Sequence, residues 1–128
     1  MGRPRFQRLL WWGREHEPNP IAFMQRGHRG WADEDTWALD EYISRILAGG
    51  LLHLANTTCV HPCRGMPPED CKNCDCEKLW DTELRENAEK FRLIAEDEWT
   101  TFEELQKLED ITKEAMAWLS QWYSALWN

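Results

Sequence analysis

The chain has 128 residues, of which 42% are hydrophobic and 30% charged, and its net charge is -8 at pH 7. This length and composition predict one globular domain with one core. No run of about 20 apolar residues occurs, which excludes a membrane-spanning segment, and the acidic balance makes the whole chain a poor general binder of nucleic acid.

The first 30 residues differ from the rest of the chain in charge. They hold six arginines against Glu15 and Glu17, whereas acidic residues outnumber basic ones in residues 31–128. A basic arm on an acidic body predicts that the arm docks on the body, with an anionic partner as the alternative. For that alternative, the residues with the charge to contact phosphate are Arg3, Arg5 and Arg8.

The arm is expected to contain one short helix. The apolar residues that can share one side of this helix are Phe6, Leu9, Leu10 and Trp12. Pro18 and Pro20 should stop any helix, and Gly27 and Gly30 should loosen the chain before the next element. The predicted organisation is therefore an arm over residues 1–30 and a bundle domain over residues 31–128.

The spacing of apolar residues predicts the first bundle helix over residues 33–55. Its stripe repeats at three- and four-residue intervals and comprises Leu39, Ile43, Ile46, Leu47, Gly50, Leu51 and Leu54. Asp33 or Asp35 can cap the helix and complement the positive end of its dipole. Gly49 and Gly50 each cost about 1 kcal/mol relative to alanine in a helix interior, so we expect a close helix crossing, a kink or a break there.

Residues 56–77 form a loop that contains all five cysteines of the chain. Its prolines and glycine exclude regular helix, and so long a connection needs something to hold it in place. Two cysteine pairs at short spacing are what a tetrahedral zinc ion requires. The expected ligands are Cys59, Cys63, Cys71 and Cys74, with Cys76 and His61 as alternates and His53 in reserve.

Disulfides, an iron–sulfur cluster and free cysteines are the alternatives to zinc. The cysteine count is odd and the sequence shows no secretory signal, so we expect a reducing compartment, where metal binding is favoured over disulfides. The cysteine spacing matches none of the usual iron–sulfur runs. Four thiolates would leave no open position on the ion, so the expected zinc is structural and the protein is predicted not to be an enzyme.

Two more helices are predicted after the loop. The first spans residues 78–97, with a buried face of Trp80, Leu84, Ala88, Phe91 and Ala95 and with Ile94 beside it. The second begins at one of two capping boxes, Thr100 with Glu103 or Thr101 with Glu104, and reaches about residue 127. Its stripe comprises Leu105, Leu108, Ile111, Ala115, Leu119, Trp122 and Leu126.

No segment alternates as a half-buried strand would. The predicted fold class is therefore all-α: a three-helix bundle with an N-terminal helical arm and a zinc-clamped cysteine-rich loop.

Two groups of aromatic residues are candidate binding surfaces. The first is an acidic-aromatic cluster of Trp31, Asp33, Asp35, Trp37 and Asp40, in which Asp33, Trp37 and Asp40 can share a helical face. It predicts either a pocket for a cation or basic peptide, or a helix cap with tryptophans at the edge of the core, and we favour the cap. The second group is Trp118, Trp122 and Trp127, which we expect mainly in the core, with a dimer or partner contact as the alternative.

The run from Gly30 to Asp40, GWADEDTWALD, resembles a signature of an uncharacterised family of small helical proteins from tailed phages and prophages. That signature has the form Gly-aromatic-small-Asp-x-Asp-x-Trp-x-x-Asp. The likeness continues loosely through residues 46–54, the threonine pair at 57 and 58, Trp80 and the final Leu-Trp-Asn. Family members place a His-Gly-aromatic-Pro turn after the threonine pair, where this chain has Cys59-Val-His-Pro and further cysteines. The resemblance implies viral origin and residence in a bacterial cytoplasm, and it carries no activity.

The function predicted from these features is binding of another macromolecule. One form of it is a phage-encoded inhibitor of a host defence or host process. The first alternative is a binder of a small ligand such as a signalling nucleotide, held between helices of a homo-oligomer by tryptophans and arginines. The second alternative is a nucleic-acid-associated accessory factor that uses the basic arm.

Overall fold

The computed structural model describes residues 20–62 and 75–127, and in those residues every regular element is a helix. In chain order these elements are α2 (Pro20–Arg29), the 3-10 helix η1 (Asp33–Ala38), α3 (Leu39–Thr57), α4 (Cys76–Glu96), α5 (Phe102–Trp122) and the 3-10 helix η3 (Tyr123–Ala125). The described part of the chain holds no strand, which confirms the prediction of an all-α fold. The described residues hold four α-helices. Three of them correspond to the helices predicted over residues 31–128, and the fourth, α2, lies within the predicted arm.

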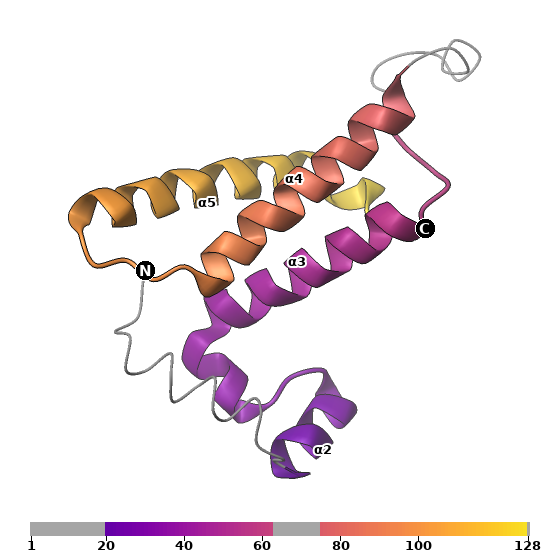
Figure 1. Cartoon of the computed structure of the whole chain (residues 1–128). Helices are drawn as coiled ribbons and strands as arrows, with labels where there is room; N and C mark the ends of the chain where they lie inside the picture. The colour runs from indigo at the N-terminus through magenta and orange to yellow at the C-terminus, as the bar shows by residue number, and fades with distance from the viewer. Residues whose placement is uncertain (1–19, 63–74, 128) are drawn as a thin grey trace.

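Helix α4 is the centre of the fold. Helix α3 lies along it in the opposite direction, and α5 returns along α4 from the turn at residues 97–101 (Figure 1). The contact between α3 and α4 is the most extensive, that between α4 and α5 is the next, and α3 and α5 scarcely touch each other. The three helices therefore pack as a helical bundle in which α4 contacts both of the others.

The core follows from the apolar face of α4. Trp80, Leu84, Ala88 and Phe91 are buried there, together with Leu51 of α3 and Ala115 of α5. The face predicted for this helix is confirmed, since Ala95 is also buried and Ile94 packs beside the core. Burial of large side chains at this spacing is the main stabilising contribution in a helical fold of this size.

Tryptophans connect α5 to α4. The ring of Trp80 lies 5.8 Å from that of Trp118 and 5.9 Å from that of Trp122, in stacked and edge-on arrangements. The indole Nε1 of Trp118 also donates a hydrogen bond of 3.3 Å to Glu83. The expected core role is thus confirmed for Trp118 and Trp122, whereas Trp127 is 61% exposed.

Helix α5 begins at the second of the two candidate capping boxes. Thr101 Oγ1 accepts a hydrogen bond of 3.2 Å from the Glu104 N–H, and the Glu104 carboxylate accepts from the N–H of Thr100 at 2.8 Å. Hydrogen bonds from the backbone of Thr100 and Thr101 hold the pKa of Glu104 below its usual range. The helix then runs to Trp122, and the chain continues as the η3 turn instead of remaining α-helical to residue 127.

The first predicted bundle helix is divided in two. Residues 33–38 wind as the tighter η1, and α3 begins only at Leu39. Helix α3 passes through Gly49 and Gly50 without a break, and no described atom lies within 4 Å of a Cβ added at either position. The expectations of a helix break and of a close helix crossing at these glycines are therefore wrong.

Half of the apolar stripe predicted for this helix is exposed. Leu51 is buried and Leu47 and Leu54 pack against the core, but Leu39 is 46% exposed and Ile43 is 42% exposed. The reason is that α3 and α5 diverge from each other at this end. An open groove of about 370 Å³ lies between them, and we call it the α3–α5 groove.

A helix also forms where the sequence predicted none. Pro20 is the first residue of α2, where it is tolerated because the first position of a helix does not need the N–H that proline lacks. Gly30 ends α2 with a φ of 86° and donates its N–H to the Arg26 carbonyl at 2.8 Å. The short helix predicted within residues 6–12 lies outside the described residues.

Candidate functional site

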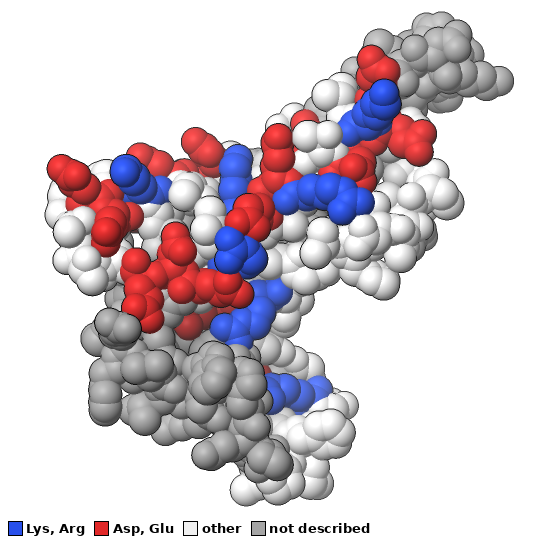
Figure 2. Space-filling view, in the orientation of Figure 1, with Lys and Arg blue, Asp and Glu red and all other residues white. Residues whose placement is uncertain are grey.

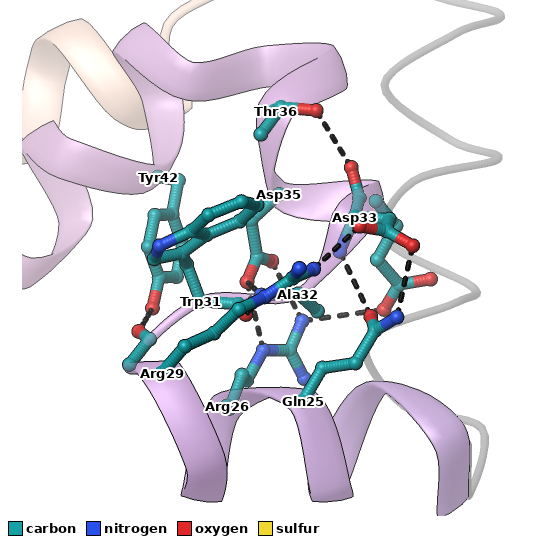
Figure 3. A network of polar contacts seen from close by, with 11 residues as sticks. Gln25, Arg26, Arg29, Trp31, Ala32, Asp33, Asp35, Thr36 and Tyr42 are labelled. Atoms are coloured by element: carbon teal, nitrogen blue, oxygen red, sulfur yellow. Dashed lines mark hydrogen bonds and ion pairs between the residues drawn. The ribbon is translucent and has the colours of Figure 1, made fainter.

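A polar network joins α2 to η1, and we call it the α2–η1 clasp (Figure 3). At its centre the Arg26 guanidinium makes two hydrogen bonds to the Asp35 carboxylate, of 3.0 Å from Nε and 2.7 Å from Nη2. The same Nη2 lies 3.2 Å from the Glu34 carboxylate. Asp35 is 1% exposed, so the ion pair is sheltered from water on its acidic side. A bidentate arginine–carboxylate pair also fixes the relative orientation of the two side chains.

Asp35 has a second role as a cap of η1. Its Oδ2 accepts a hydrogen bond of 2.7 Å from the N–H of Ala32. The sequence analysis placed Asp35 as a possible cap at the start of the helix. Asp35 is instead the third residue of η1, and its side chain accepts the hydrogen bond from the backbone of the N-cap residue. The 3-10 winding of residues 33–38 is what places one carboxylate against both Ala32 and Arg26.

The charge state of the clasp follows from these contacts. Burial on its own would raise the pKa of Asp35, but hydrogen bonds from Arg26 and Ala32 and the charge of Arg26 outweigh burial and lower it. The hydrogen bond to Asp35 in turn raises the pKa of Arg26. Both groups are therefore ionised at neutral pH and hold each other in place.

An outer ring of contacts surrounds this pair. Asp33 forms an ion pair with Arg29, and its backbone and side chain exchange two hydrogen bonds with Gln25, of 2.9 Å and 2.8 Å. The Arg29 guanidinium lies 3.7 Å from the centre of the Trp31 ring. Tyr42 of α3 donates its hydroxyl to the Gly30 carbonyl at 2.9 Å and so ties the end of α2 to the bundle.

The acidic-aromatic residues predicted from the sequence are divided between two places. Trp31 and Asp33 belong to the clasp, where the cation over the tryptophan ring is the chain's own Arg29. Trp37 is 57% exposed, and Asp40 lines the α3–α5 groove. The structure thus brings Trp31 and Asp33 together for a structural purpose and places Asp40 on a different surface.

The clasp presents an apolar surface that the sequence analysis missed. Helix α2 turns Ala22, Arg26 and Arg29 toward η1, and on its other sides Ile21 is 69% exposed, Phe23 78% and Met24 71%. Figure 1 shows α2 set apart from the α3–α4–α5 layer. The signal that was overlooked is a proline at the first position and a glycine just past the end of a ten-residue helix.

Two of the five cysteines, Cys59 and Cys76, lie at the two ends of the connection between α3 and α4. Cys59 is exposed just beyond the end of α3, and Cys76 is 3% exposed at the first position of α4. The loop residues Cys59 and His61 line a hollow of about 490 Å³ together with Trp80 and Asp81. Within residues 20–62 and 75–127, no three His, Cys, Asp or Glu side chains are grouped so as to hold a metal ion.

The donors that the structure describes fit a thiolate-rich site only in part. Cys59 is accessible to an ion, whereas Cys76 is buried and so fits less well as a ligand than as a core residue. Cys63, Cys71 and Cys74, and the arm residues Arg3, Arg5 and Arg8, lie outside the described residues. The reserve ligand His53 lies exposed on α3, toward its end.

In the described part of the chain no helix is long and apolar enough to cross a membrane. Comparisons with protein-family models, with curated proteins and with solved structures found no match for the chain.

Proposed function

We propose that this chain is a non-enzymatic, zinc-stabilised helical protein that binds another protein through the exposed apolar face of α2. The observation that carries the proposal is the exposure of Ile21, Phe23 and Met24 on a helix whose opposite face is fixed by the Arg26–Asp35 pair. Patches of large exposed apolar side chains are typical of protein–protein interaction sites.

The geometry of α2 fits insertion of a helix into a groove of the partner. Ile21 and Met24 are three residues apart, which is the spacing of anchor residues in this mode of recognition, and Phe23 lies on the adjoining side of the helix, next to Met24 in the sequence. Because the clasp already fixes the orientation of α2, less conformational entropy is lost on binding.

A structural zinc ion supports this function by joining α3 to α4. The proposed ligands remain Cys59, Cys63, Cys71 and Cys74, with Cys76 and His61 as alternates. Such an ion would supply folding free energy and fix the connection beside Trp80. The resemblance of residues 30–40 to small phage and prophage proteins supports a viral origin and residence in a bacterial cytoplasm.

Binding is tested with two variants matched in residue type and exposure. Tagged wild-type protein, Phe23→Glu and Phe102→Glu are used to capture proteins from bacterial lysate; Phe102 of α5 is 75% exposed and far from the clasp. A specific partner should be retained by wild type and Phe102→Glu and lost by Phe23→Glu. With that partner purified, calorimetry should show at least a tenfold weaker affinity for Phe23→Glu, since buried aromatic anchors contribute about 2 kcal/mol or more. Equal binding by all three proteins would remove α2 from the interface.

The zinc proposal is tested separately. Elemental analysis of protein purified without added metal should give one zinc per chain. Cys59→Ser should release the zinc ion and lower the melting temperature, because binding of a structural zinc ion contributes roughly 10 kcal/mol of folding free energy. A Cys59→Ser variant that melts like the parent, or a parent without zinc, would contradict the clamp and leave the α2 proposal standing.

A further inference from the structure

The α3–α5 groove is an apolar surface feature that the proposed function does not use. Leu39 and Ile43 of α3 line one wall, Leu105, Leu108 and Met116 of α5 line the other, and Ile94 of α4 lies between them. Leu39, Ile43 and Met116 are each more than two-fifths exposed. In a helical fold of this size, so much apolar surface along one channel predicts an occupant.

The charge around the groove indicates what kind of occupant it is. Its two charged lining residues, Asp40 and Glu109, are both acidic. Figure 2 shows acidic side chains gathered at the end of the bundle where α4 meets α5, and the chain there carries Glu96, Asp97, Glu98, Glu103 and Glu104. An apolar floor with an acidic border fits a segment that is apolar on one side and basic on the other.

The chain itself contains such a segment in residues 1–19. Its apolar residues at helical spacing are Phe6, Leu9, Leu10 and Trp12, and its basic residues are Arg3, Arg5, Arg8 and Arg14. The segment joins α2 at Pro20, α2 is clasped to η1, and η1 leads directly into Leu39 at the wall of the groove. Nineteen residues reach up to about 60 Å when extended, so the tether does not limit access, and a short tether gives an effective concentration of about millimolar.

We propose that residues 1–19 dock in the α3–α5 groove, with their aromatic and leucine side chains on its apolar walls and their arginines toward Asp40 and Glu109. Residues 1–19 then pack as an additional segment against α3, α4 and α5. They cover the part of the α3 apolar stripe that α5 leaves exposed. This surface is separate from the apolar face of α2, so the proposal does not depend on the proposed function.

The test is hydrogen exchange in the full chain, read by mass spectrometry on peptides from residues 5–13. In wild type these amides should exchange at least tenfold more slowly than in an unstructured peptide, because an isolated helix of this length is marginal in water and gives little protection. Leu39→Lys and Met116→Lys, on opposite walls, should each abolish that protection. Leu52→Lys should retain it, since Leu52 lies on α3 outside the groove and is as exposed as Leu39, at 46%.

Protection of residues 84–95 in α4 reports whether each variant is folded, and having a variant on each wall keeps the test intact should one of them misfold. Charge is tested with Asp40→Asn combined with Glu109→Gln, which should speed exchange of the arm severalfold. The proposal is overturned by unprotected arm amides in wild type or by protection that survives both groove variants. It is also overturned by protection that falls on dilution together with a dimer in light scattering, because the occupant would then be a second copy.

Discussion

The α4-centred core and the α2–η1 clasp hold their helices together by different means. The core buries large apolar side chains, among them Trp80, Leu84 and Phe91. The clasp buries the small side chains of Ala22, Ala32 and Ala38, and its largest fully buried side chain is the Asp35 carboxylate. One region is stabilised by apolar area removed from water, and the other by a few directed polar contacts.

This difference determines how each region responds to change. Apolar burial has no preferred direction and is shared among many contacts, so it resists changes of pH and salt. An ion pair that is buried on one side depends on both partners, and the loss of either leaves a charge without compensation. The clasp should therefore open as a local unit, whereas the core should unfold with the whole domain.

The largest expected effect is in the core. Phe91→Ala should lower the free energy of unfolding by about 3–5 kcal/mol, because it removes a fully buried ring and leaves a cavity. Urea denaturation followed by circular dichroism measures the loss. The control is Phe102→Ala, which removes an exposed ring and should change stability by no more than about 0.5 kcal/mol. Similar losses for the two variants would show that α4 is not the centre of the core.

The second effect separates the clasp from the core. Arg26→Met keeps the length of the side chain but leaves Asp35 buried without its partner, which should cost about 2–3 kcal/mol. Hydrogen exchange should speed up in residues 20–32 and stay unchanged in residues 84–95. Arg92, exposed between Glu89 and Glu96, provides the matched control, and Arg92→Met should leave both regions unchanged. Equal acceleration in both regions would mean that the clasp and the core unfold together.

The third effect is a dependence of the clasp on pH. The pKa of Asp35 is lower in the folded protein than in the unfolded chain, where it is about 3.9. Its contribution to stability is thus complete above about pH 4 and is lost as the pH falls through the lower, folded value. Protection of the amides of residues 20–32, measured relative to their intrinsic exchange rates at each pH, should fall over that window in wild type. In Asp35→Asn this protection should already be low at neutral pH and should change less on acidification.

The smallest effects come from glycines and have opposite signs in the two regions. Gly49→Ala should stabilise the domain by about 0.5–1 kcal/mol, since α3 is helical there and an added Cβ meets no described atom. Gly30→Ala should destabilise the clasp by about 1 kcal/mol, because residue 30 has a φ of 86°. Thermal denaturation measures the first and hydrogen exchange of α2 the second. A destabilising Gly49→Ala would reveal a close approach to that face of α3.

Residues of α4 illustrate what could be predicted from the sequence. Trp80, Leu84, Ala88, Phe91 and Ala95 were predicted as one buried face from their spacing alone, and all five are buried. The Thr101–Glu104 box was likewise readable, because a cap is a contact between residues close together in the chain. The same reasoning missed α2, because Pro20 was considered only as the end of a preceding helix and not also as the start of the next one.

Local patterns in the sequence predicted that the described chain is helical, which face of α4 is buried, and that α5 begins at one of two overlapping capping boxes, because periodicity and caps are local properties. The tertiary structure was needed to show that α5 does not cover the first half of α3. Leu39 and Ile43 therefore line an open groove, although they belong to the same apolar stripe as Leu51. The tertiary structure also decided that Asp35 meets Arg26 nine residues away. An amphipathic pattern predicts that one face of a helix is buried. It does not predict which element covers that face, because helix crossing angles and contacts between distant charges depend on packing between elements.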